Sequence, residues 1–234
     1  MRSWTSAFLM LLRFWDTDRS LTALLAALCL FLFVVTPLAS SAVFGSELSI
    51  AFFTLLTVTG VAAVARKPTL VALVATLAIG SVALDWIAHF GATLHVQIEN
   101  LVLRVIFVLL LGTLVTSQVF RPGNVTHHRV QGAIVIYLLA AMAWSHLYQI
   151  VGLLDGSAFW LSPAARAGSA LGLFRYYSFE TLTTLGAGDV LPVSPMARAL
   201  ASSEALFGQL YPAAMIARLI SLELSKGVVG RSGD

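Results

Sequence analysis

The residues best placed to do chemistry form one short run, 178–192, between two long apolar stretches. Its centre consists of Thr184, Leu185, Gly186, Ala187, Gly188 and Asp189. Glycine readily adopts the positive-φ conformations that other residues resist, so two glycines separated by one residue let successive carbonyl oxygens point to one side. Thr184 can add a hydroxyl and a carbonyl oxygen at the inner end. Four such loops around one axis would form stacked oxygen cages that replace the hydration shell of a cation.

This run resembles the pore helix and selectivity filter of potassium channels, whose core reads Thr-Val-Gly-Tyr-Gly-Asp. The chain has Thr-Leu-Gly-Ala-Gly-Asp at 184–189, so four of six positions agree. The similarity continues through a threonine-rich stretch before the run, and through 204–211, which looks like the inner helix of prokaryotic channels of the voltage-gated-like superfamily. It covers roughly residues 130–225. The resemblance implies that K⁺ is held by the main-chain oxygens of Thr184, Leu185, Gly186 and Ala187, with Gly188 completing the filter.

The resemblance also implies how the filter is supported. Glu180 and Asp189 occupy positions that meet behind the filter in this family, often sharing a proton because adjacent carboxylates resist double ionisation. Tyr176 and Tyr177 stand where the family commonly has tryptophans that form an aromatic cuff. We therefore expect all four side chains to brace the filter from behind.

Ala187 departs from the family pattern, because a tyrosine ring normally packs behind the filter at this position. A buried aromatic side chain covers about 150–250 Å², so its loss removes bracing while the ion-facing carbonyl remains. Potassium preference weakens if it depends on rigid oxygen geometry, and persists if it depends on ligand number and field strength.

The composition indicates an integral membrane protein. The chain is 59% hydrophobic and 11% charged, whereas soluble domains carry about 25% charged residues. A spanning helix needs about 20 mostly apolar residues. We expect spans at 21–38, 48–65, 69–90, 101–120, 130–153 and 196–224. The stretch 171–184 is too short to cross and is expected to be a re-entrant pore helix, whose irregular exit is tolerated where it lines a pore.

Charge placement predicts the orientation. Ten of the fourteen Lys and Arg residues lie at the N-terminus or in alternate connections: Arg2, Arg13, Arg19, Arg66, Lys67, Arg121, Arg129, Arg218, Lys226 and Arg231. Such segments face the cytoplasm. We expect a multi-pass protein of the cell membrane with both termini inside, and outer loops around Glu47, around Glu99 and at 155–168.

The N-terminal region allows two interpretations. Residues 1–20 read as an amphipathic cytoplasmic segment at the membrane surface, followed by an uncleaved first helix. Alternatively, 1–42 is a signal peptide with small residues at 39–42. The single cysteine, Cys29, lies mid-span and is interpreted as packing.

Four helices before a pore module resemble the layout of six-helix cation channels, which implies an all-α architecture of six transmembrane helices. A filter of this kind is made by four loops, so we expect a tetramer. We expect a voltage-sensor-like four-helix domain at 21–120 and a pore domain at 130–225. Voltage sensors carry a basic residue at every third position of the fourth helix, but here only Arg104 of that register is charged. It could cross the field, or form a static pair with Asp85. Steep voltage gating is not expected.

The last helix contains Gly208 and Pro212, four residues apart. Proline removes one helical hydrogen bond and kinks the helix, so the two residues predict a gating hinge, with a fixed packing kink as the alternative. Residues 226–234 are expected to be a short cytoplasmic tail, with no appended ligand-binding domain.

We thus expect a homotetrameric channel that passes monovalent cations, with K⁺ preferred, and that contacts membrane lipids. The alternatives are a poorly selective cation channel, a non-conducting channel-like subunit and a secondary transporter. No enzyme motif, cofactor other than the permeant K⁺, or nucleic-acid partner is indicated.

Ala187→Tyr tests the effect of the missing ring. The substitution should raise the permeability of K⁺ relative to Na⁺, because the ring restores packing behind the filter. Reversal potentials in mixed K⁺ and Na⁺ measure this ratio. An unchanged ratio would show that rigidity at this position does not set selectivity.

Overall fold

The computed structural model describes residues 19–36, 38, 60, 68–89, 91, 93–120, 127–166 and 170–231. The N-terminal segment up to residue 18 lies outside this part. So does the expected second span at 48–65, apart from Gly60. In chain order the elements are α2 (Arg19–Leu30), the π-helical turn η1 (Phe31–Val35), α5 (Pro68–His89), α6 (Leu94–Val119), α7 (His127–Leu154), β1 (Phe159–Leu161), α8 (Pro163–Arg166), α9 (Ala170–Leu182), β2 (Val190–Pro192) and α10 (Pro195–Arg231).

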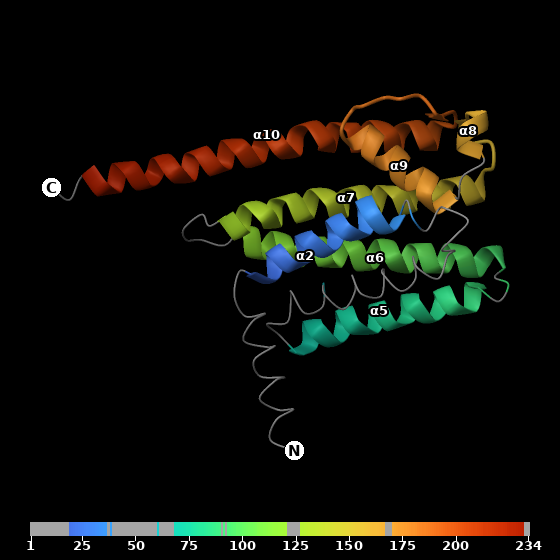
Figure 1. The fold of residues 1–234 in the computed structure, drawn as a ribbon, viewed down its shortest axis with the longest axis horizontal. Helices are drawn as coiled ribbons and strands as arrows, with labels where there is room; N and C mark the ends of the chain where they lie inside the picture. Colours follow the sequence, from blue (N-terminus) through green and yellow to red (C-terminus); the bar gives the residue numbers. More distant parts are fainter. Residues whose placement is uncertain are drawn as a thin grey trace, which may run out of the picture.

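The helices are layered around α7. Helix α6 packs along α7, α5 covers α6, and α2 lies against α7 (Figure 1). The short helix α9 contacts both α7 and α10. The starts of α2, α5 and α7 and the ends of α6 and α10 lie at one end of the bundle, at the left in Figure 1, and α10 extends beyond the others there. From α5 through α6 and α7 to α10, each long helix therefore runs opposite to the long helix before it.

The core of this bundle forms where apolar residues recur at helical spacing. Leu24 and Leu28 of α2, four residues apart, pack with Phe107 and Leu111 of α6 and with Leu139 of α7. Residues four apart lie on one face of a helix. This periodicity therefore buries one face of each helix against the others.

The outward faces of the helices are apolar as well. Ile106 and Leu109 of α6 and Ile134 of α7 are exposed beside that core. Within the described residues, two helices, Leu94–Val119 and His128–Leu154, are long and apolar enough to cross a membrane. A helix that is hydrophobic all round is typical of a membrane span or a large core.

Several expected boundaries differ from the structure. Helix α6 begins at Leu94 and not at residue 101, so Glu99 lies in the helix and not in a loop. Helix α10 continues to Arg231, so most of the expected tail at 226–234 is helical. A polar residue in a first or last turn does not end a helix, because its side chain reaches solvent. The segment between α7 and α10 also contains two three-residue strands, β1 and β2, within a fold that is otherwise helical, as the all-α prediction expects.

A buried arginine joins the first helix to α9. The Arg175 guanidinium donates to the Thr36 hydroxyl and lies 4.7 Å from the centre of the Phe31 ring. Thr36 in turn donates to the Phe31 carbonyl oxygen over 2.8 Å, at the π-helical turn. Among the residues that the structure describes, no carboxylate pairs with Arg175. The ring and the hydroxyl therefore stabilise this charge, because a cation over an aromatic face is attracted by it.

Thr36→Val should destabilise the contact between the end of η1 and α9. The valine keeps the shape but removes the acceptor of a charged donor, which costs about 1.5–3 kcal/mol. The matched control is Thr113→Val, because the exposed Thr113 hydroxyl bonds only the Leu110 carbonyl of its own helix. Circular dichroism, recorded while the purified proteins unfold in detergent, measures the stability of both variants. Equal stability of the two variants would contradict this role of Thr36.

Candidate functional site

The stretch at 183–188 leaves the end of α9 through a tight hydrogen-bonded turn. The Thr184 N–H donates to the Thr181 carbonyl over 3.1 Å, and the Leu185 N–H donates to the Glu180 carbonyl over 2.8 Å. These bonds satisfy carbonyls that a helix end otherwise leaves without partners. The expected pore helix, 171–184, corresponds to α9, which ends at Leu182.

The backbone beyond this turn alternates in handedness. Thr184, Gly186 and Gly188 have φ of 56°, 65° and 83°, and the residues between them are outside the positive-φ region. The positive φ predicted for the two glycines is therefore confirmed. Alternation of left-handed and right-handed residues brings successive carbonyls to the same side. The positive φ of Thr184 was not predicted from the sequence, because non-glycine residues seldom adopt this conformation.

One side of this stretch is open in the single chain. Leu185 is 69% exposed, and a Cβ built on Gly186 or Gly188 would meet nothing within 4 Å. Thr184 and Ala187 are exposed as well. The rest of the described chain thus leaves this side of the stretch uncovered.

Glu180 braces the same stretch from the other side. Its Oε1 accepts the Gly188 N–H over 2.9 Å, although eight residues separate the two, and the side chain is buried. Asp189 was expected to meet Glu180, but among the described residues no hydrogen bond joins their side chains. The exposed Asp189 instead contributes its backbone carbonyl, which accepts the Ser162 N–H over 2.9 Å.

A two-stranded antiparallel sheet holds the far end of the stretch. Strand β1 pairs with β2 in the register Phe159–Pro192, Trp160–Leu191 and Leu161–Val190. The Val193 N–H extends the contact by donating to the Ala158 carbonyl over 2.8 Å. The segment that enters α9 and the segment that leaves the filter-like run are therefore fixed to each other.

The two tyrosines expected in an aromatic cuff have different surroundings. Tyr177 is buried, with its ring centre 4.8 Å from that of Tyr148 and 5.8 Å from that of Phe159. Tyr176 is exposed. Within one chain, only Tyr177 packs behind the candidate site.

Helix α10 approaches α9 closely at Gly208. A Cβ at this position would collide with the Leu182 carbonyl group, whose carbon would be 2.8 Å away. One residue further, Gln209 donates through its side-chain nitrogen to the Thr184 hydroxyl over 3.2 Å. Pro212 lies inside the helix, which continues through it. Gly208 thus has a packing role at the base of the candidate site in addition to the predicted hinge role.

Glu204 is a site residue whose role the sequence interpretation missed. Its carboxyl group is completely buried between three helices, where it contacts the Tyr148 hydroxyl over 2.5 Å and the Ser178 hydroxyl. An isolated acidic residue in an apolar helix is expensive and often functional. The sequence signal for this role was an acidic residue surrounded by apolar residues within the last expected span.

The predicted pair of Arg104 and Asp85 stays a prediction. Arg104 is buried on the face of α6 that turns inward, whereas the side chain of Asp85 lies outside the described part.

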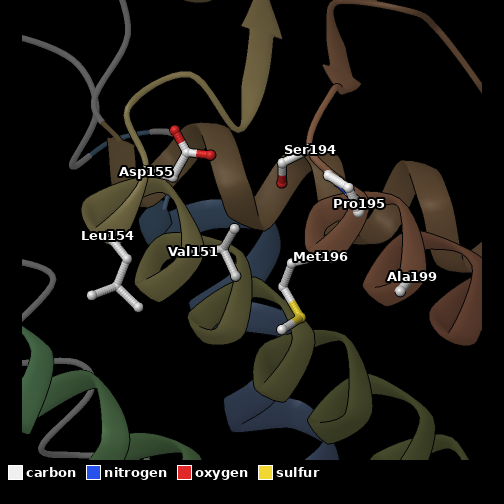
Figure 2. Close-up of a pocket in the computed structure, with 7 residues that line it drawn as sticks. All are labelled: Val151, Leu154, Asp155, Ser194, Pro195, Met196 and Ala199. Carbon is white, nitrogen blue, oxygen red and sulfur yellow. The ribbon is translucent and has the colours of Figure 1, made fainter.

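An open pocket lies away from the candidate site, between the end of α7 and the start of α10 (Figure 2). It is lined by Val151, Leu154, Asp155, Ser194, Pro195, Met196 and Ala199. The Asp155 carboxylate bonds the Ser157 N–H and hydroxyl, and these bonds lower its pKa. With one acidic group and mainly apolar walls, the pocket has few groups that could orient a polar ligand.

The structure thus places a short helix, α9, within an apolar bundle and follows it with a braced backbone of alternating handedness. Residues 132–223 match the model of the ion channel family. The matched segment contains almost all of α7, all of α9, the filter-like stretch and most of α10. The match indicates an ion channel, and with the apolar helices it indicates a membrane protein. No curated protein and no solved structure matches the chain.

Gly208→Ala should separate α10 from α9. The added methyl meets backbone atoms of Leu182, which cannot rotate away, and overpacking of this kind costs about 1–3 kcal/mol. Gly112→Ala is the control, because a Cβ there meets nothing within 4 Å. Thermal unfolding in detergent compares the two variants. Loss of stability in Gly112→Ala alone, or in neither, would contradict the close approach.

Proposed function

We propose that the protein is a channel that conducts monovalent cations passively through a filter of main-chain oxygens, with K⁺ preferred. The observation that carries this proposal is the alternating backbone of Thr184, Gly186 and Gly188. Such a backbone can present a row of carbonyl oxygens that replaces the hydration shell of a cation.

The open side of the stretch supports a homotetramer. One chain supplies oxygens from one side only, whereas a cation in a filter of this type is surrounded by four chains. The exposed positions Leu185, Gly186 and Ala187 would then face the symmetry axis or its neighbours. The apolar stripe of Leu206, Leu210 and Ile220 on α10 is exposed in the single chain and suits an inner helix.

The contacts that brace the filter support the proposal that K⁺ is still preferred although Ala187 replaces the tyrosine of the family. The Glu180 carboxyl holds the Gly188 N–H, and the β1–β2 sheet fixes the chain just after the filter. These contacts replace part of the rigidity that a tyrosine ring would supply. A poorly selective cation channel is the second candidate, and Ala187 is the residue that favours it.

The arrangement of helix ends supports both termini in the cytoplasm of a multi-pass protein in the cell membrane. The start of α7, with Arg129, lies at the same end of the bundle as the end of α6, where Arg218 of α10 stacks over the Phe120 ring (Figure 1). Basic residues favour the cytoplasmic side. The filter exit and the sheet lie at the opposite end.

Single-channel recording in planar bilayers tests this function. The purified protein should give discrete currents whose reversal potential follows the K⁺ gradient. Gly186→Ala should abolish them, because an alanine in the left-handed conformation costs about 1–2 kcal/mol in each subunit. Gly112→Ala should conduct like the natural protein. Absence of current from correctly assembled protein would exclude conduction, and saturable flux that depends on a coupled substrate would indicate a transporter.

A further inference from the structure

Three buried side chains from three helices meet behind the filter. Glu204 of α10 lies between Tyr148 of α7 and Ser178 of α9, and all three are fully buried. The Tyr148 hydroxyl donates to Glu204 Oε2, and the Ser178 oxygen lies against Oε1. The inner helix is thus hydrogen-bonded to the pore helix and to the helix outside it at one point.

The number of hydrogen atoms available for hydrogen bonding decides which protonation state of Glu204 satisfies all of its contacts. The Ser178 oxygen is also 2.7 Å from the Ala141 carbonyl oxygen, but a hydroxyl has only one hydrogen to donate. If Glu204 is ionised, one of the two Ser178 contacts contains no hydrogen and brings two acceptors together. If Glu204 is protonated on Oε1, it donates to Ser178, Ser178 donates to Ala141, and Tyr148 donates to Oε2. Only this arrangement gives each short contact a hydrogen.

The surrounding charges favour the same state. The titratable groups that interact with Glu204 from α7 and α9 are the phenols of Tyr137, Tyr148 and Tyr177. No basic side chain contacts Glu204 among the described residues. A buried carboxylate without a cation is costly, and such groups are neutral more often than charged.

We propose that Glu204 keeps its proton at neutral pH, and that this neutral carboxyl positions the inner helix against the pore helix. Protonated Glu204 acts as donor and acceptor at once, so it closes the hydrogen-bond chain from Tyr148 to Ala141. Removal of the proton at alkaline pH breaks the chain at Ser178 and loosens the contact that also includes Gly208 and Leu182. Glu204 is a positioning residue, because it acts on the filter through α9 and does not touch the ions.

Infrared spectroscopy of the full-length protein in lipid tests the protonation directly and does not depend on conduction. The natural protein should show a protonated-carboxyl C=O band at neutral pH that is lost at alkaline pH and shifts in D₂O. Glu204→Gln should remove that band. Glu99→Gln is the matched control, because Glu99 is exposed at the start of α6, and it should leave the band intact. No band in the natural protein, or a band whose intensity is unchanged in Glu204→Gln, would overturn the proposal.

Stability against pH tests the positioning role. The amide of Glu204→Gln can donate to Ser178 and accept from Tyr148, so this variant should keep the unfolding midpoint of the natural protein at neutral pH. Its midpoint should also lack the fall that linkage predicts for the natural protein, which begins above the pH at which a free carboxyl ionises and ends where Glu204 loses its proton in the folded protein. Glu204→Ala should unfold earlier at every pH. An alkaline response that is unchanged in Glu204→Gln would refute the role, whatever the bilayer recordings show.

Discussion

Main-chain oxygens can face an ion only if something else holds the chain that carries them. A backbone of alternating handedness has no ladder of its own hydrogen bonds, so its shape depends on its surroundings. Here the Glu180 carboxyl holds the Gly188 N–H, and Gln209 contacts the Thr184 hydroxyl from α10. The turn below is closed by the amides of Thr184 and Leu185. The stretch at 184–188 is therefore held both from α9 and from α10.

The supports form two layers that meet at α9. On one face, α10 approaches so closely that position 208 has no room for a side chain, and Glu204 joins the hydroxyls of Tyr148 and Ser178. On the other face, Arg175 joins α9 to the first helix. The short helix is thus held by polar contacts on both sides within an apolar bundle. Such contacts are specific because an unsatisfied buried polar group costs about 1–3 kcal/mol.

Local rules predicted the helices and the positive φ of Gly186 and Gly188, because both depend on nearby residues. What the sequence could not supply depends on contacts between distant segments. The left-handed Thr184 follows from the turn that ends α9, and the inward rotation of Tyr177 follows from packing on Phe159. The pairing of β1 with β2 joins segments about thirty residues apart, which no local pattern encodes. Glu204 was visible as a lone acid, but its partners come from two other helices.

The length of α10 has a mechanical consequence. The 24 residues from Gly208 to Arg231 remain helical, which at about 1.5 Å per residue makes an arm of about 35 Å beyond the contact with Leu182. A rigid arm pivoting at that contact amplifies small rotations, so a tilt of about 10° would sweep its far tip through about 6 Å. A weak force on the tip would therefore act on the contact between Gly208 and Leu182 with considerable leverage.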